Sequence, residues 1–379
     1  MSALLKYALR YMPLLVVALF LIPLNIYMLN INVQRPASSS LPAPSPFGPG
    51  SALYGITMLS SDEAWAVGGT FLAKPSGKDA TNQTYIPNGG IILHYASGGW
   101  SLARVSGSLQ LPLLSVSFDS SRDGWAVGWG GTMAHYSGDS WSVVSNAANF
   151  KQNLLSVAML SPSNGWAVGY SGSILHYDGK QWMPVPSPTR LDLRGIAMLS
   201  PVEGWAVGNG GTILHYAHGT WSAVSSSPTT STLNSVTMLS TNEGWAVGQQ
   251  GTILHYRNGD WVSVHPVNYY RNPATYQSAN FFSIAANSIR SGWIAGDQHF
   301  LTYRSEVWTE PDTIVNIYTS GAKAKASATS HYYFGLYSIA ISPSGEVWAV
   351  GSVTNAQFEN SLGMFHYQGG KWYVYSYSA

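Results

Sequence analysis

One phrase occurs seven times in this chain, and this repeat restricts the possible folds more than any other feature. Three central copies read GWAVGYSGSILHYDGKQW, GWAVGNGGTILHYAHGTW and GWAVGQQGTILHYRNGDW, starting at Gly165, Gly204 and Gly244. The first tryptophan of the phrase recurs about every 40 residues through the centre, a spacing typical of repeat architectures. Its seven positions are Trp65, Trp125, Trp166, Trp205, Trp245, Trp293 and Trp348.

Each copy divides into four β-type segments. In the fifth copy these are LNSVTML from Leu233 to Leu239, then GWAVG, then GTILHY, then a strand that opens with Trp261, with Gly, Ser, Asn and Asp at the turns between them. Four short antiparallel strands form one propeller blade. A single blade cannot bury both faces of its sheet, whereas blades packed in a ring can. The sequence therefore predicts an all-β, seven-bladed propeller of four-stranded antiparallel blades over residues 52–379, with the seven tryptophans as structural core residues.

The N-terminal region differs in character from the repeats. Residues 11–34 carry no charge, and a helix of that length spans about 36 Å, enough to cross a membrane. Lys6 and Arg10 precede this stretch, so the positive-inside rule places residues 1–10 in the cytoplasm. Residues 35–51 are rich in Pro, Ser and Gly and read as a tether. We expect a single-pass signal anchor in the cell membrane and an extracytoplasmic propeller; a cleaved secretory signal is the alternative, and it exports the same domain.

Composition excludes several classes of site. The chain has no cysteine and a formal net charge of +1, so thiolate metal sites are excluded and no electrostatic footprint for nucleic acid is visible. Histidines occupy an equivalent position in six blades, but equivalent positions around a ring do not converge on one ion, which favours structural hydrogen bonding. The acidic residues before GWAVG, such as Glu203, read as turn formers and solubilising charges. We expect no cofactor, no metal and no catalytic residue. The six histidines are His94, His135, His176, His215, His255 and His366.

Four long insertions distinguish the copies. Gly69–Gly90 and Ser352–Leu362 lie between the second and third strands of blades one and seven, and Pro266–Asn280 and Pro311–Gly335 lie between blades five and six and between blades six and seven. In an up-and-down blade both kinds of junction open on the same face of the ring, which we call the loop face. The insertions therefore cluster on the loop face over blades five, six, seven and one.

Aromatic and uncharged residues dominate these insertions. Tyrosine among Asn and Ser makes contact area at low entropic cost in protein and glycan recognition. The alternative is that the insertions are surface decoration with some rings packed on the propeller. The candidate binding residues are Tyr85, Tyr269, Tyr270, Arg271, Tyr276, Tyr318, His331, Tyr332, Tyr333 and Phe334.

The pattern GWAVGxxGTILHYxxGxW resembles the repeat of photosystem II assembly-factor-like propellers and, more distantly, the Asp-box repeat of sialidase-type (BNR-like) propellers, over residues 52–379. In the latter repeat the third strand usually ends in Thr or Ser followed by Asp-Gly-Gly, whereas His-Tyr stands here and only Asp178 keeps the acidic residue. The Asp boxes are thus mostly eroded. The resemblance implies a seven-bladed extracytoplasmic propeller that binds other proteins.

We therefore expect a membrane-anchored, non-enzymatic protein-binding or assembly scaffold, whose partner is a protein or membrane assembly that contacts the loop face. The alternative is a carbohydrate-binding or glycoside-hydrolysing propeller, in which the same tyrosines would stack on sugars and Glu310 with Asp312 would supply acid and base. A sialidase would need several arginines around its substrate, and the long insertions offer only Arg271.

Overall fold

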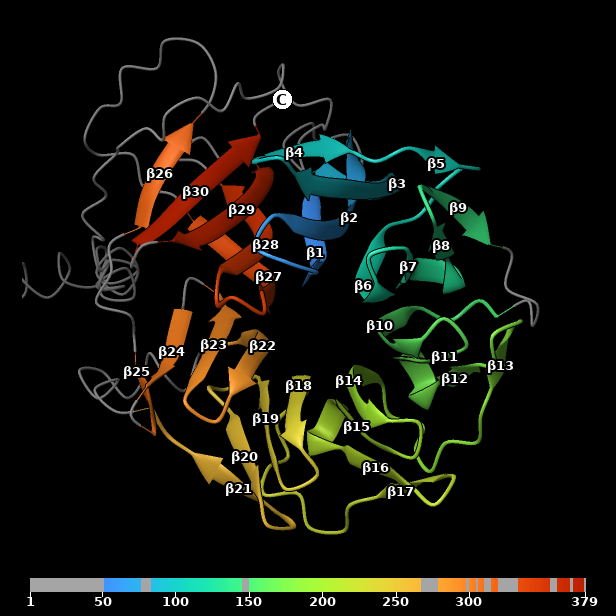
Figure 1. Ribbon diagram of the computed structural model, residues 1–379, viewed down its shortest axis with the longest axis vertical. Coiled ribbons are helices and arrows are strands. Elements are labelled where there is room, and N and C mark those ends of the chain that lie inside the picture. The colour runs from blue at the N-terminus through green and yellow to red at the C-terminus, as the bar shows by residue number, and fades with distance from the viewer. Residues whose placement is uncertain are drawn as a thin grey trace, which may run out of the picture.

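Seven β-sheets stand around a central axis like the blades of a propeller (Figure 1). The computed structural model describes residues 51–75, 83–144, 150–266, 279–297, 300–304, 306–309, 315–319, 333–354, 360–368 and 371–377. In each blade four antiparallel strands follow one another outward from the axis in chain order. This confirms the predicted propeller with four-stranded antiparallel blades.

The strands of the seven blades are as follows. Blade one contains β1 (Ala52–Met58), β2 (Glu63–Pro75), β3 (Gln83–Ala96) and β4 (Gly99–Leu102); blade two contains β6 (Leu113–Ser120), β7 (Asp123–Gly128), β8 (Met133–Ser137) and β9 (Ser140–Val144). Blade three contains β10 (Leu154–Ser161), β11 (Asn164–Gly169), β12 (Ile174–Tyr177) and β13 (Trp182–Pro184); blade four contains β14 (Leu193–Ser200), β15 (Glu203–Gly208), β16 (Ile213–Ala217) and β17 (Thr220–Ala223). Blade five contains β18 (Leu233–Ser240), β19 (Glu243–Gly248), β20 (Ile253–Arg257) and β21 (Asp260–Val264). Blade six contains β22 (Phe281–Ser288), β23 (Ser291–Gly296), β24 (Phe300–Arg304) and β25 (Val307–Thr309). Blade seven contains β27 (Tyr333–Ile341), β28 (Val347–Thr354), β29 (Asn360–Gln368) and β30 (Lys371–Tyr377).

Two blades carry a fifth strand at their outer edge. In blade two, β5 (Val105–Ser106) pairs parallel to β9, and in blade seven β26 (Val315–Thr319) pairs parallel to β30. Both strands come from the connection that enters the blade, so the chain runs along the outer edge before it turns in to the axis. Part of the predicted insertion Pro311–Gly335 is therefore a strand that covers the edge of blade seven, which protects that edge from unwanted pairing.

The hydrophobic core is divided among the seams between neighbouring blades. Trp205 and Ile213 of blade four pack with Leu233, Val236 and Trp261 of blade five, all of them buried. Leu214 and Tyr216, which point to the other side of the same strand, pack instead against blade three. This is the alternation that the ILHY pattern predicts, and it explains why each blade needs both neighbours.

The last glycine of each GWAVG phrase lets adjacent strands come close. A Cβ atom added to Gly208 would lie 2.0 Å from the carbonyl oxygen of Asp192, and the equivalent Gly128 and Gly248 meet the backbone at 2.1 and 2.0 Å. No side chain fits there, which accounts for the glycine at this position of the repeat.

The ring closes by packing between blade one and blade seven. The described strands of blade one come only from the start of the propeller and those of blade seven only from its end, so no strand is exchanged between them. Leu53 and Ile56 of β1 share a buried cluster with Trp348 and Met364 of blade seven. The backbone N–H of Ile56 also donates to the Oγ of Ser338, 3.2 Å away.

Most of the region preceding the propeller lies outside the described residues. This includes the predicted transmembrane helix over residues 11–34 and all of the tether except Ser51, which is buried. In the described part of the chain no helix is long and apolar enough to cross a membrane.

Candidate functional site

The innermost strands of the seven blades line a channel along the axis of the ring (Figure 1). Each inner strand starts at the loop face and ends at the opposite face, which we call the turn face because the turns after the first and third strands lie there. In each inner strand the residue that follows a fully buried Leu or Phe therefore lies at the channel mouth on the loop face. These residues are Tyr54, Leu114, Leu155, Arg194, Asn234, Phe282 and Tyr337.

One side of this mouth is aromatic. The ring of Tyr337 in blade seven lies 5.4 Å from that of Tyr54 in blade one and 5.5 Å from that of Phe282 in blade six, measured between centroids. Burial, together with the neighbouring Tyr337, raises the pKa of Tyr54 to about 12. The Tyr54 hydroxyl is thus neutral at physiological pH. We call these three residues the aromatic arc.

The opposite side of the mouth carries a cation. Among the described residues that line the channel, Arg194 is the one with a charged side chain. Its Nε donates to Asn209 Oδ1 at 2.6 Å, and Asn209 Nδ2 donates in turn to Asp192 Oδ2 at 3.1 Å. Asp192 Oδ1 accepts the backbone N–H of Ser171 at 2.9 Å. This carboxylate is therefore held by the loop backbone and by Asn209, and within the described ranges no ion pair reaches Arg194.

A ring of serine hydroxyls lies below the mouth. Each hydroxyl accepts the backbone N–H of the next blade's inner strand, for example Ser156 Oγ from Ile196 and Ser235 Oγ from Ile284, both at 3.3 Å. Ser115, Ser283 and Ser338 make the same contact, at 3.2 Å each. A hydroxyl that accepts in this way keeps its own hydrogen for donation. These hydrogen bonds connect neighbouring blades, and the hydroxyl hydrogens of the serines remain available as donors along the channel.

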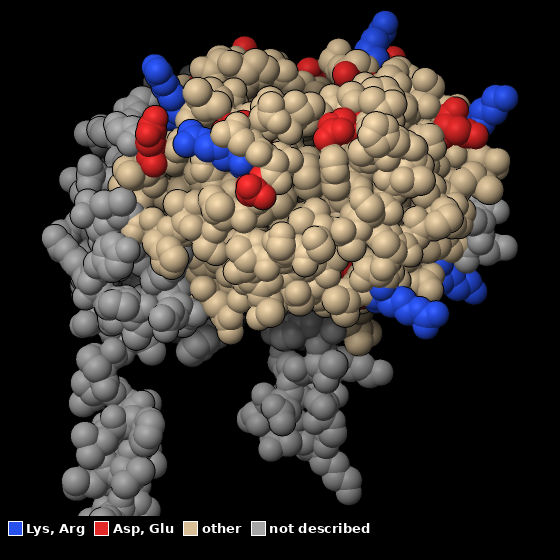
Figure 2. Space-filling model, turned by 90° about the horizontal axis from the view of Figure 1, so that it is seen from below, with Lys and Arg blue, Asp and Glu red and all other residues tan. Residues whose placement is uncertain are grey.

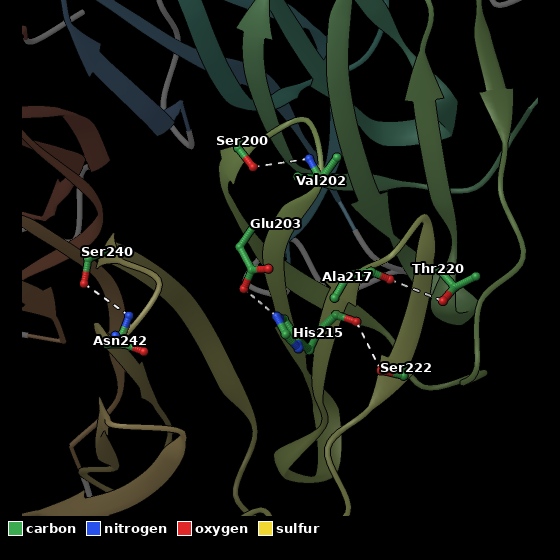
Figure 3. A network of polar contacts seen from close by, with 9 residues as sticks. All are labelled: Ser200, Val202, Glu203, His215, Ala217, Thr220, Ser222, Ser240 and Asn242. Atoms are coloured by element: carbon green, nitrogen blue, oxygen red, sulfur yellow. Dashed lines mark hydrogen bonds and ion pairs between the residues drawn. The ribbon is translucent and has the colours of Figure 1, made fainter.

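The turn face is built differently, because in blades two, four and five a carboxylate is hydrogen-bonded to a histidine of the same blade. In blade four Glu203 Oε1 lies 2.6 Å from His215 Nε2 (Figure 3). The imidazole stacks on Trp205, with centroids 4.0 Å apart. Asp123 pairs with His135 at 2.9 Å, and Glu243 pairs with His255. The interpretation of these carboxylates as turn formers and solubilising charges was incomplete, since each positions a histidine on a core tryptophan. Glu63 with His94 and Glu346 with His366 are looser pairs, at 3.5 and 3.7 Å.

His366 is the most enclosed of these histidines. Its carboxylate neighbour Glu346 is beyond hydrogen-bonding distance, and burial lowers the pKa of His366 to about 4. The ring is therefore neutral near pH 7 and stacks on Trp348, with centroids 4.2 Å apart. Such a histidine contributes to the packing of the blade's core. In blade six Thr302 takes the equivalent position, paired across the sheet with Trp293.

Charged side chains are concentrated away from the loop face. Most of those coloured in Figure 2 lie towards one side of the ring. The turn-face segments supply Asp62, Arg122, Asp139, Lys180 and Arg290, among others. The loop face has few described charges and exposes an aliphatic pair: Leu72 and Ile86, paired across the extended β2–β3 hairpin, are 50% and 40% exposed. An exposed aliphatic pair on a long hairpin is a contact surface that the described residues leave uncovered.

The structure locates only some of the predicted binding residues. Tyr85, Tyr318 and Tyr333 lie in strands, with backbones paired to Ala73, Tyr375 and Thr354. Phe334 is half-buried and packs on Phe300 and Phe365, so part of its ring belongs to the core. The remaining six lie outside the described residues: Tyr269, Tyr270, Arg271, Tyr276, His331 and Tyr332.

Sequence reasoning missed the channel mouth, although a signal for it exists. In every copy the inner strand has a fully buried Leu or Phe, followed two residues later by Gly or Ser, whereas the residue between them is Tyr, Leu, Arg, Asn or Phe. A variable position between two nearly constant ones indicates a side chain that the packing between blades does not constrain. The same comparison would have found the acid–histidine pairs, because 12 residues separate the two partners in blades two, four and five.

Comparison with known proteins supports the fold. No protein-family description matches the chain, and no curated protein matches it. Among solved structures, "YCF48 bound to D1 peptide" is similar with a TM-score of 0.56 and 16% identity, over 84% of this chain and 95% of that one. YCF48 from Cyanidioschyzon merolae gives 0.54 and 14%, over 82% and 95%. The WD40 β-propeller domain of Doa1 gives 0.57 and 10%, over 85% and 94%. Identities this low establish the propeller fold alone, and membership of the Asp-box family is not shown.

Proposed function

We propose that this protein is a non-enzymatic scaffold that binds a partner protein or assembly through its loop face. The contrast between the two faces of the ring carries the proposal. On the turn face, Asp123 pairs with His135 and Glu203 pairs with His215, each within a single blade. The loop face presents an aliphatic hairpin pair, an aromatic arc and a guanidinium without an ion-pair partner in the described residues. Exposed apolar surface and an arginine without an ion-pair partner on one face are typical of protein-binding sites.

The solved structures give this proposal a precedent at the level of the fold. One similar propeller, YCF48, was solved with a D1 peptide bound. A ring of this architecture can therefore hold a peptide. Glu310 and Asp312, which the glycoside-hydrolysing alternative would use, lie outside the described residues.

The same proposal includes an anchor in the cell membrane and an extracytoplasmic propeller. Residues 11–34 form an uncharged stretch long enough to cross the bilayer, and a 17-residue tether would reach roughly 50 Å. Because β1 starts at the loop face, the tether would leave the ring on that face. The test is protease treatment of intact cells that express the full chain. We expect external protease to remove the propeller from the membrane fraction; a propeller protected until the cells are lysed would contradict the proposed orientation.

The binding face is tested with matched pairs of exposed aliphatic residues. Leu72→Ser with Ile86→Ser changes the loop face, and Val202→Ser with Ile289→Ser changes two turn-face residues that are 64% and 59% exposed. The full chain and both variants are used for proximity labelling in membranes, together with a variant in which Tyr269, Tyr270, Tyr332 and Tyr333 are changed to Ala.

We expect the two loop-face variants to lose labelling of a specific partner that the turn-face variant keeps. Loss in the turn-face variant with retention in both loop-face variants would refute the proposal. If no form labels a protein and the intact form binds a glycan array, the carbohydrate function replaces it.

A further inference from the structure

We propose that the channel mouth receives an acidic side chain from the partner, flanked in the partner's sequence by an aromatic or aliphatic residue. Arg194 would pair with the carboxylate, and the aromatic arc would hold the apolar neighbour. The inference rests on the protein-binding function proposed above and names the chemistry that this function would recognise.

The charge of the ligand follows from the surroundings of Arg194. Its Nε is occupied by Asn209, and the one carboxylate close to that bond, Asp192, is held by Ser171 and Asn209. The guanidinium is half-buried, and within the described ranges it has no counter-ion. A half-buried arginine that makes no ion pair within the described ranges favours an anion with two oxygens in one plane.

The apolar part of the ligand follows from the rest of the mouth. Tyr54, Phe282 and Tyr337 form a continuous set of rings over blades six, seven and one, and Leu114 and Leu155 continue the lining through blades two and three. Because the Tyr54 hydroxyl stays neutral, this side offers no second charge. A doubly charged phosphate would find one cation here, whereas a carboxylate beside an apolar group matches both sides.

The position of the mouth selects a side chain that is inserted from above. All seven inner strands line the channel, and Ser156 of blade three lies beside the strand of Arg194, bonded through its hydroxyl to Ile196. Arg194 lies at the mouth, so a ligand does not need to thread its main chain through the channel. A segment that crosses the loop face can instead point one long acidic side chain down to Arg194 and donor hydroxyls while its main chain contacts the surrounding loops.

The experiment measures binding of capped peptides to the full chain in detergent by titration calorimetry. The probe is acetyl-GSFELSG-amide, which has one carboxylate and no charged terminus. Three peptides are compared with it. Acetyl-GSFQLSG-amide lacks the charge, and acetyl-GSAEASG-amide lacks the apolar neighbours. Acetyl-GSFL has a free terminal carboxylate. The protein variants are Arg194→Gln and, as a matched control, Arg190→Gln, an exposed arginine four residues earlier that does not line the channel.

We expect the change from E to Q in the peptide to weaken binding about tenfold, since that corresponds to one lost charge-assisted pair. Arg194→Gln should cause a similar loss for the acidic peptide and none for the neutral one, and Arg190→Gln should change neither. Loss of the apolar neighbours should weaken binding several-fold. A melting curve unchanged by Arg194→Gln verifies that the ring is intact.

Three outcomes would overturn the inference. One is equal binding of the acidic and neutral peptides. Another is acidic-peptide binding that Arg194→Gln leaves unchanged. The third is preferential binding of the peptide with the free terminal carboxylate, which would assign the mouth to chain ends. In each case the protein-binding function stands if the loop-face variants still lose their partner, so the two proposals fail separately.

Discussion

Replacement of Trp205 by Ala should open the seam between blades four and five. The indole is 3% exposed, stacks on His215 of its own blade and contacts Tyr256 and Trp261 of the next blade, with centroids 4.6 and 5.7 Å away. An aromatic side chain removes about 150 to 250 Å² from water, worth on the order of 4 to 6 kcal/mol as an upper bound. Residual burial in the unfolded chain reduces this figure. We therefore expect the free energy of unfolding to fall by about 4 kcal/mol, within the range for buried Trp→Ala changes.

A second tryptophan supplies the control. Trp129 lies in the short 3-10 turn η1 (Trp129–Gly131) on the loop face, is only partly buried and meets Phe71 edge-on with centroids 6.0 Å apart. Trp129→Ala removes the same atoms but should cost only about 1 to 2 kcal/mol, because less of the ring leaves water on folding. Guanidinium titrations followed by far-ultraviolet circular dichroism compare the two. Equal losses, or a loss below about 1 kcal/mol for Trp205→Ala, would refute the assignment of stability to the blade seams.

Three further predictions concern the blades themselves. Burial lowers the pKa of His366 to about 4, so as the pH falls the unfolded chain takes up a proton before the folded chain does. The free energy of unfolding should therefore be highest above pH 6.5 and fall by up to roughly 3 kcal/mol towards pH 4. Denaturant titrations at several pH values should show a smaller pH dependence for His366→Thr. Truncation after Tyr367 removes β30 and the fully buried Trp372, which should lower the melting temperature by roughly 10 °C or more; an unchanged calorimetric melt would show that blade seven does not need its fourth strand. Glu203→Gln weakens the 2.6 Å bond to His215 and should cost about 1 kcal/mol in urea titrations at pH 7, whereas an increase in stability would contradict a structural role for the pair.

The blades could be predicted from the sequence because their determinants are local and repeated. The segment Leu233–Leu239 was predicted as a strand and β18 spans Leu233–Ser240, and the alternation in ILHY correctly assigned Ile213 and Leu214 to opposite seams. Each of these features depends on residues within one repeat, and seven copies confirm one another. The acid–histidine pairs also lie within one repeat. They follow from the register, since Glu203 and Trp205 share a face and His215 is paired opposite Trp205.

The channel mouth and the edge strands could not be predicted in the same way. Tyr54 and Tyr337 are 283 residues apart, and their ring contact exists only because the first and last blades meet. The local sequence of β14 does not show that Arg194 faces the aromatic arc, because the two are brought opposite each other only when the ring closes. Similarly, β26 pairs in parallel with β30, about 57 residues later, and nothing in its short sequence indicates which strand it will join.

Hydrogen exchange of the protein with and without its captured partner tests most directly which face of the ring is used. The loop face contains the turns at residues 129–131, 170–172 and 209–211, and the turn face contains those at 120–122, 161–163 and 200–202. We expect the partner to slow exchange in the first set and leave the second unchanged. Protection confined to the second set would place the partner on the turn face and contradict the account.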